Sequence, residues 1–346
     1  MTLIRHDIDE IPAAVEDLLV TGANDLHAAA RAVRAASPAL VVSVGRGHYA
    51  EVCAFLKCAT ALLLDVPTAL VHPSVASIFQ EELRLGQALC LVVSKHGQSA
   101  DLVHLTHLAE MDGAITVALT NNTTSPLGLA ARSTIGLQAG REQSRIATKT
   151  AITSLVAGLW LLADWKGDGE LRRAIHDLPR VLEQALGCDW SELIEALDGS
   201  VVTLGNGPGH VVARAAALRL RETCQIRAES YSMDEIPGGP IAAIDGCLPM
   251  IGFAIGDKAE AEFAEYADSL AEKGAQVFVT SHLVRRAQSL DHLRSTHWLT
   301  DALPLIVSFY VLIERLCAMR GFDPDFPAVT EQDDNAQLVG GTTAFS

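Results

Sequence analysis

The stretch VVSVGRG at Val41 to Gly47 returns as VVTLGNG at Val201 to Gly207, 160 residues later. Each copy is a short apolar run that ends in a glycine turn, which predicts a buried strand followed by a turn and a helix. The register is kept further on, where Gly113-Ala114 precedes ITVALT and Gly274-Ala275 precedes QVFVTS. The repeat predicts two copies of one α/β domain, each with a parallel sheet flanked by helices.

The repeat also divides the chain of 346 residues into five parts. The expected parts are a helical lead-in at 1–36, a first domain at 37–165, a helical connector at 166–198, a second domain at 199–325 and a C-terminal tail at 326–346. The connector is predicted to contain a polar break at Lys166 to Glu170.

Composition and charge narrow the classes of partner. A formal net charge of −16 argues against a nucleic-acid surface, which needs clustered Lys and Arg. The apolar run at Ala151 to Leu162 is too short to span a membrane and is expected to be a core helix. The N-terminus, MTLIRHDIDEIP, has acidic residues where a signal peptide has a basic region, so a cytoplasmic location is expected.

The sequence gives no pattern for a metal or an organic cofactor. The seven cysteines are spread without a CxxC pair and are expected to be buried thiols. No His/Cys/Asp group has ligand spacing, so no metal is expected. Neither glycine turn fits the GxGxxG fingerprint of a dinucleotide site.

Glu222 is the candidate acid–base residue. It lies at the end of a predicted helix whose apolar residues recur at helical spacing, namely Ala213, Ala216, Ala217 and Leu220. An apolar surround raises the pKa of a carboxyl, which suits a group that takes a proton from carbon and returns it. An exposed Glu at a helix end would give the same sequence.

A second candidate is the loop SKHGQSAD, which follows an apolar strand at Leu89 to Val93 and precedes a helix. Backbone N–H groups and hydroxyls at a helix N-terminus favour an anion, so a phosphate would fit there. The alternative is that Ser94 and Ser99 only cap the helix. The matching loop of the second copy, GFAIGDKAEAEF, has no serine cluster, so only the first copy is expected to bind phosphate.

Several motifs together resemble the sugar isomerase (SIS) family, most closely the isomerase half of glucosamine-6-phosphate synthase and the glucosamine-6-phosphate deaminases of the same fold. The resemblance rests on ALRLRE ending at Glu222, on AES-Y at Ala228 to Tyr231, on SKHGQSAD and on GREQSRIATKT at Gly140 to Thr150. It covers nearly the whole chain. It implies two tandem SIS domains, each a flavodoxin-like three-layer sandwich.

The resemblance implies roles for particular residues. Glu222 matches the glutamate that moves the proton between sugar carbons. The implied substrate and phosphate contacts are Gly45, Arg46, Gly47, His48, Ser94, Lys95, His96, Gln98, Ser99, Arg145 and Ala147. An arginine at 145 could pair with a second anion in the cleft or simply be exposed.

Several positions depart from the family pattern, among them Arg145 and Ala147 in the segment at 140–150. Gly238 stands where the family has a ring-opening histidine, and His96 stands where it has a serine. In the tail, Ala328 follows Pro327 directly, so the family's Schiff-base lysine has no match. A histidine at 96 could keep anion binding with a new pH dependence, or could fill the pocket.

The resemblance implies an isomerase or deaminase acting on a hexosamine or ketose phosphate through an enediol or enolamine. The alternatives are a sugar-phosphate sensor without catalysis, or an enzyme on another substrate in which Arg145, His48 or His96 takes over the lost roles. The expected assembly is a homodimer or a higher even oligomer, since SIS pockets resemble sites closed by a neighbouring subunit.

Overall fold

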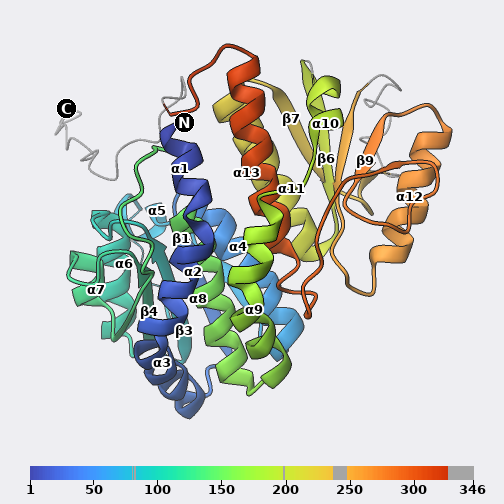
Figure 1. The fold of residues 1–346 in the computed structure, drawn as a ribbon. Helices are drawn as coiled ribbons and strands as arrows, with labels where there is room; N and C mark the ends of the chain where they lie inside the picture. The colour runs from blue at the N-terminus through green and yellow to red at the C-terminus, as the bar shows by residue number, and fades with distance from the viewer. Residues whose placement is uncertain (80, 82, 198, 237–247, 326–346) are drawn as a thin grey trace, which may run out of the picture.

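The computed structural model describes residues 1–79, 81, 83–197, 199–236 and 248–325 (Figure 1). Two five-stranded sheets, in which every pair of neighbouring strands is parallel, form its framework. The strands are β1 Leu40–Gly45, β2 Thr68–Leu70, β3 Ala88–Ser94, β4 Ile115–Thr120, β5 Ser133–Gly136, β6 Ser200–Gly205, β7 Arg227–Ser232, β8 Met250–Phe253, β9 Val277–Val279 and β10 Gln288–Ser289.

The two sheets have the same topology. The first has the order β2-β1-β3-β4-β5, and the second has the order β7-β6-β8-β9-β10. Numbered within its own domain, each sheet is 2-1-3-4-5, the flavodoxin-like order. The predicted duplication and the predicted fold class are therefore confirmed.

The helices lie between and around the sheets. They are α1 Leu3–Asp9, α2 Ile11–Thr21, α3 Ala23–Ala36, α4 His48–Leu64, α5 Ser74–Ser77, α6 Ala100–Met111, α7 Pro126–Ala130, α8 Lys149–Lys166, α9 Gly169–Ala185, α10 Ser191–Ala196, α11 Gly207–Cys224, α12 Glu260–Glu272 and α13 Ala302–Met319. The predicted lead-in thus consists of three helices, which begin at Leu3, Ile11 and Ala23.

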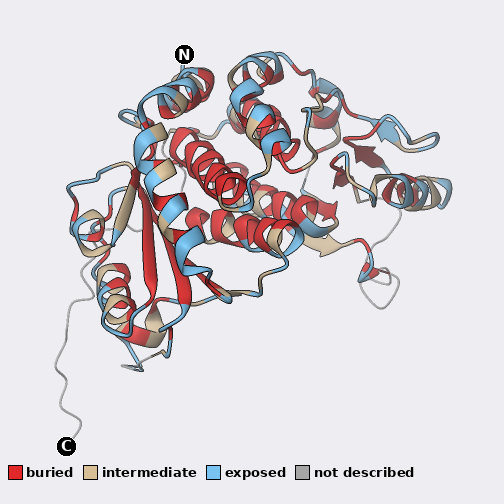
Figure 2. Cartoon of the chain, turned by 90° about the horizontal axis from the view of Figure 1, so that it is seen from below, coloured by how far each residue is buried: buried red, intermediate tan, exposed pale blue. Residues whose placement is uncertain are grey.

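One hydrophobic core joins the two domains. It takes residues from the inner faces of both sheets and from α4, α8, α9, α11 and α13, which lie between the sheets (Figure 1). Most residues of α4, α8, α11 and α13 are buried, whereas α9 buries only one face, and Figure 2 shows buried helices at the centre of the molecule. Two smaller cores lie on the outer faces, under α6 in the first domain and under α12 in the second. The domains are therefore fused through a common middle layer.

Glycine ends the first strand of both domains for the same steric reason. A Cβ at Gly45 would lie 2.6 Å from the carbonyl oxygen of Tyr49, and a Cβ at Gly205 would lie 2.4 Å from the carbonyl carbon of Gly209. In each case the first turn of the next helix crosses the strand end four residues later. Gly47 adds a φ of 52°, which L side chains rarely adopt.

Helix α13 is a longer apolar segment than the run at Ala151 to Leu162. Among the described helices it is long and apolar enough to cross a membrane by length and composition, and the expectation based on Ala151 to Leu162 did not include it. However, 78% of its apolar window is buried inside the protein, where it packs against α9 and α11. Such burial is typical of a core helix.

Candidate functional site

The candidate site lies where the strand order of the first sheet reverses. Strand β1 has β2 on one side and β3 on the other, with Gly45 in register with Val93. In open α/β sheets ligands bind outside the carboxyl ends of strands at such a point. The turn at 45–47 and the loop at 94–99 follow these two strand ends, so the topology brings both predicted segments together.

The two serines of the loop are buried but do not cap helix α6. The hydroxyl oxygen of Ser94 accepts a hydrogen bond from the backbone N–H of Gly97 at 3.1 Å. Ser99 occupies the N-cap position of α6 without a capping hydrogen bond from its side chain. Both residues are only 2% exposed. The simple capping interpretation therefore lacks its expected hydrogen bond.

The charged side chains around the loop have carboxylate partners. The ammonium of Lys95 lies 3.1 Å from Oε2 of Glu142, and Nη1 of Arg46 lies 3.5 Å from Oδ2 of Asp101. His96 and Gln98 are exposed. An incoming phosphate would find two cations nearby but would compete with their carboxylates.

The segment at 142–150 is held by buried carboxylates. Oε1 of Glu142, whose side chain is fully buried, accepts a hydrogen bond from the N–H of Thr148 at 2.7 Å. Asp7, from α1, accepts hydrogen bonds from the backbone N–H groups of Gln143 and Ser144 and lies 3.2 Å from the ammonium of Lys149. The lead-in helix thus fixes one wall of the site.

Within this segment, the two residues that depart from the family pattern have different environments. Arg145 is exposed, whereas Ala147 is 1% exposed. The carbonyl oxygen of Ala147 accepts a hydrogen bond from Nη2 of Arg219 at 2.5 Å. Ala147 therefore contributes its backbone rather than its side chain.

Three side chains meet across the domain boundary. Nε2 of His48, at the first position of α4, lies 3.1 Å from Oε2 of Glu222 on α11. The same nitrogen lies 2.5 Å from Nη1 of Arg219. The side chain of His48 is 7% exposed and that of Glu222 is 28% exposed. A carboxyl open to solvent beside a buried imidazole is an arrangement that can pass protons.

These contacts correct one sequence-based expectation and add one residue that the sequence did not point to. An apolar surround for Glu222 was wrong, because its carboxylate faces His48 and keeps contact with solvent. Arg219 was not predicted at all. Arg219 lies three residues before Glu222 on the predicted helix, and residues three apart share a helix face. This spacing could have indicated that Arg219 lies near the candidate base.

Three possible metal ligands lie close together at the C-terminal end of α1. Ligand atoms of His6, Asp7 and Glu10 lie within 4.8 Å of one another. The ammonium of Lys149 lies 3.2 Å from Asp7 and 2.5 Å from Glu10. This buried cation pairs with both carboxylates and offsets one of their two negative charges.

Two cavities lie at the reversal point of the second domain. The space between Asn206, Asp257 and Glu260 is about 10 Å³, and a second one beside Gly207 and Ser232 is about 410 Å³. Carboxylates line both cavities, and like charge disfavours an anion there. That only the first copy binds phosphate stays a prediction.

Two departures from the family pattern lie outside the described residues. They are Gly238 and the tail at 326–346, where the family has its histidine and its lysine.

Comparison with known proteins agrees with the fold. The SIS domain model matches residues 40–163. A solved structure from Silicibacter pomeroyi DSS-3, assigned as a candidate phosphosugar isomerase, is 49% identical, covers 94% of this chain and 100% of that one, and has a TM-score of 0.91. The C-terminal domain of glucosamine-fructose-6-phosphate aminotransferase from Francisella tularensis has a TM-score of 0.81 at 18% identity over 94% and 98% of the two chains.

Curated relatives extend the comparison. The isomerizing glutamine–fructose-6-phosphate aminotransferase of Sulfolobus acidocaldarius is 25% identical over 329 residues, which cover 93% of this chain and 54% of that protein. The chain thus spans about half the length of the curated relatives it matches. The matching domain model, the close relative at 49% identity and the duplicated fold lead to one conclusion: the chain belongs to the SIS-domain family.

Proposed function

We propose that this protein is a phosphosugar isomerase or aminosugar-phosphate deaminase that moves a proton between neighbouring carbons of an open-chain hexose phosphate. The observation that carries the proposal is the contact of 3.1 Å between Oε2 of Glu222 and Nε2 of His48. It supports a site in which the candidate base, in contact with solvent, lies beside a second titratable group. The names of the relatives, which include fructose 6-phosphate and phosphosugars, support the substrate class.

The phosphate would bind at the loop 94–99. Ser94 and Ser99 are buried there, and Lys95 and Arg46 supply positive charge. Because Gly47 directly precedes His48, the turn that borders the anion site also starts the helix that presents the imidazole. Arg46, beside the phosphate, and His48, beside the reacting carbons, would thus be only two residues apart in the chain.

The chemistry assigned to Glu222 is general acid–base catalysis. As a carboxylate it removes a proton from the carbon next to the carbonyl or imine, and the C–H electron pair forms the C1–C2 double bond. The π pair of the C=O or C=N bond moves to its oxygen or nitrogen, which takes a proton from water and gives an enediol or enolamine. The carboxyl then returns its proton to the neighbouring carbon as the other C–O bond becomes the carbonyl and its hydroxyl proton returns to water. His48 replaces the family histidine as the second acid–base group. Isomerisation leaves the atoms of the substrate unchanged, whereas deamination adds water and releases ammonia.

The test is deuterium exchange at C1 and C2 of glucosamine 6-phosphate and fructose 6-phosphate in D₂O. We expect Glu222→Gln to lower the exchange rate by on the order of 10²- to 10⁴-fold, the usual contribution of a positioned acid or base. His48→Ala should slow reaction of the cyclic sugar more than that of an open-chain analogue, because ring opening needs the second group.

Two exposed residues give matched controls, Glu265→Gln on α12 and His107→Ala on α6. Both should exchange at the wild-type rate. Exchange that survives Glu222→Gln would refute the mechanism. A wild-type protein that binds these sugars but exchanges no deuterium would instead support a sugar-phosphate sensor.

A further inference from the structure

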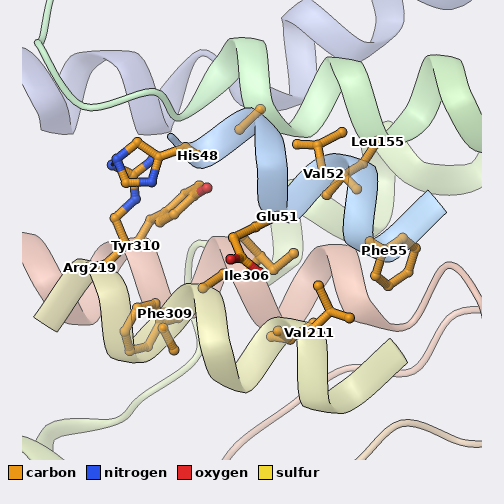
Figure 3. A pocket seen from close by; sticks show the side chains of 14 residues that line it. His48, Glu51, Val52, Phe55, Leu155, Val211, Arg219, Ile306, Phe309 and Tyr310 are labelled. Atoms are coloured by element: carbon orange, nitrogen blue, oxygen red, sulfur yellow. Dashed lines mark hydrogen bonds between the residues drawn. The ribbon is translucent and has the colours of Figure 1, made fainter. Parts of the chain in front are cut away.

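Arg219 is a buried cation that the acid–base chemistry leaves unexplained. Arg219 is 3% exposed, and its guanidinium reaches from the second domain to His48 and Ala147 of the first. Nη1 reaches Nε2 of His48 at 2.5 Å, and Nη2 donates to the carbonyl oxygen of Ala147 at 2.5 Å. The guanidinium carbon lies 5.9 Å from the centre of the Tyr310 ring (Figure 3). The side chain is therefore fixed at both nitrogens.

This contact determines which ring nitrogen of His48 carries the proton. A guanidinium has only donors, so Nε2 of His48 must offer its lone pair to Arg219. In the neutral imidazole the remaining proton is then on Nδ1. The same Nε2 faces Oε2 of Glu222 at 3.1 Å. A nitrogen that presents a lone pair cannot donate to a carboxylate, and this lone pair is already taken by Arg219.

We infer that Arg219 is a positioning residue, which holds Nε2 of His48 as an acceptor so that this nitrogen cannot donate a hydrogen bond to the carboxylate of Glu222. The inference rests on the proposed function and deepens it. The lone pair of Nε2 is taken by Arg219, so Glu222 faces no donor from His48. Without that hydrogen bond the carboxylate keeps its strength as a base, which favours proton removal from carbon.

The surroundings of the contact are mostly apolar. A cavity of about 50 Å³ lies beside His48 and Arg219, and most of its lining is apolar side chains from α4, α8, α11 and α13 (Figure 3). Two further titratable groups line it. Glu51 is paired through Oε1 with Nη2 of Arg214 at 2.9 Å, and burial raises the pKa of Tyr310, so its hydroxyl stays neutral. In such an apolar setting a charged hydrogen bond is strong.

The shape of arginine matters as well as its charge. One guanidinium nitrogen is tied to the carbonyl of Ala147, which leaves the other aimed at His48. Lysine has a single nitrogen and could not hold both groups in the same fixed geometry. Gln could still donate one N–H to Nε2, whereas Met could donate none.

The experiment measures the tautomer directly, by NMR of protein labelled with ¹⁵N-histidine, with the His48→Asn spectrum used to assign the signals of His48. In the wild type we expect the proton on Nδ1. In Arg219→Met we expect it to move to Nε2, where it donates to Glu222, while Arg219→Gln keeps the wild-type tautomer. The matched control is Arg221→Met, because Arg221 lies on the same helix and also donates to a carbonyl, that of Ala228. It should leave the spectrum unchanged.

Kinetics supply the second readout. A catalytic imidazole in the wrong tautomer loses on the order of 10²- to 10⁴-fold in kcat. Arg219→Met should show such a loss with KM changed by less than about two-fold. The acidic limb of its pH–rate profile should also move to lower pH, because the carboxylate form then gains the hydrogen bond. A purely structural role would change stability without moving the limb.

The outcomes separate the inference from the proposed function. A wild-type His48 with its proton on Nε2 would overturn the inference even if exchange depends on Glu222, and this measurement needs no variant to fold. An Arg219→Met protein with an unchanged tautomer would overturn it too. Wild-type protein with the expected tautomer but no exchange on any sugar tried would overturn the proposed function and the catalytic use of this contact together.

Discussion

Replacement of Asp7 by alanine should destabilise the protein far more than the loss of an exposed carboxylate would. Asp7 is fully buried, accepts hydrogen bonds from the N–H groups of Gln143 and Ser144, and lies 3.2 Å from the ammonium of Lys149. Burial disfavours the charged form of Lys149, but hydrogen bonds to Glu10 and Asp7 outweigh it and raise its pKa. Lys149 is therefore charged at neutral pH.

The magnitude follows from what the alanine leaves behind. Removal of one partner of a buried ion pair costs about 3–5 kcal/mol. Each of the two backbone N–H groups left unpaired would by itself cost about 1–3 kcal/mol. These terms overlap, and Lys149 keeps Glu10 at 2.5 Å, so the expected loss is about 4 kcal/mol. With a urea m-value of about 3 kcal/mol/M, the midpoint should fall by roughly 1 M.

The assay is urea unfolding followed by circular dichroism, with two comparison variants. Asp9→Ala removes a partly exposed partner of Arg5 and should cost less than about 1 kcal/mol. Asp7→Ala combined with Lys149→Met should be more stable than Asp7→Ala alone, because the unpaired ammonium is gone. An Asp7→Ala loss no larger than that of Asp9→Ala, or a double variant with no recovery, would refute the argument.

Two further predictions concern pH and assembly. Burial lowers the pKa of His292 to about 4. Between pH 6.5 and 4 the imidazole is therefore protonated in the unfolded chain but neutral in the folded protein. The free energy of unfolding consequently decreases as the pH falls through this range. The unfolding free energy of wild type minus that of His292→Gln should therefore rise by at most about 3 kcal/mol from pH 4 to 7, and a flat difference in chemical denaturation would contradict the assignment. We also propose a homodimer, motivated by exposed apolar side chains such as Ile78 and Phe79, which are 61% and 68% exposed. Sedimentation at micromolar concentration that shows only a species near 36.8 kDa would exclude it.

The sequence predicted the fold well because the signals for it are local. A strand such as Ala88–Ser94 is apolar throughout and buried throughout, so its type can be recognised without knowledge of its neighbours. The glycine at each first strand end is required by a helix turn only four residues away. Strand β7 was missed as a strand because RAESYS has mixed burial and few apolar residues.

The site was predicted less completely because its contacts are not local. His48 was among the expected binding residues, and Glu222 was the expected base, but 171 residues separate His48 from Arg219. Nothing within either segment indicates that one imidazole nitrogen faces both an arginine and a glutamate. The role of Asp7 as the support of the segment at 142–150 was hidden for the same reason.

The common middle layer has a consequence for synthesis on the ribosome. The first domain presents the apolar faces of α4 and α8 to α11 and α13, which follow much later in the chain. At a translation rate of about 5–20 residues per second, roughly ten seconds or more pass between the emergence of His48 and that of Glu222. During that interval the nascent chain carries a half-covered core, a surface on which chaperones act, and its acid–base pair does not yet exist.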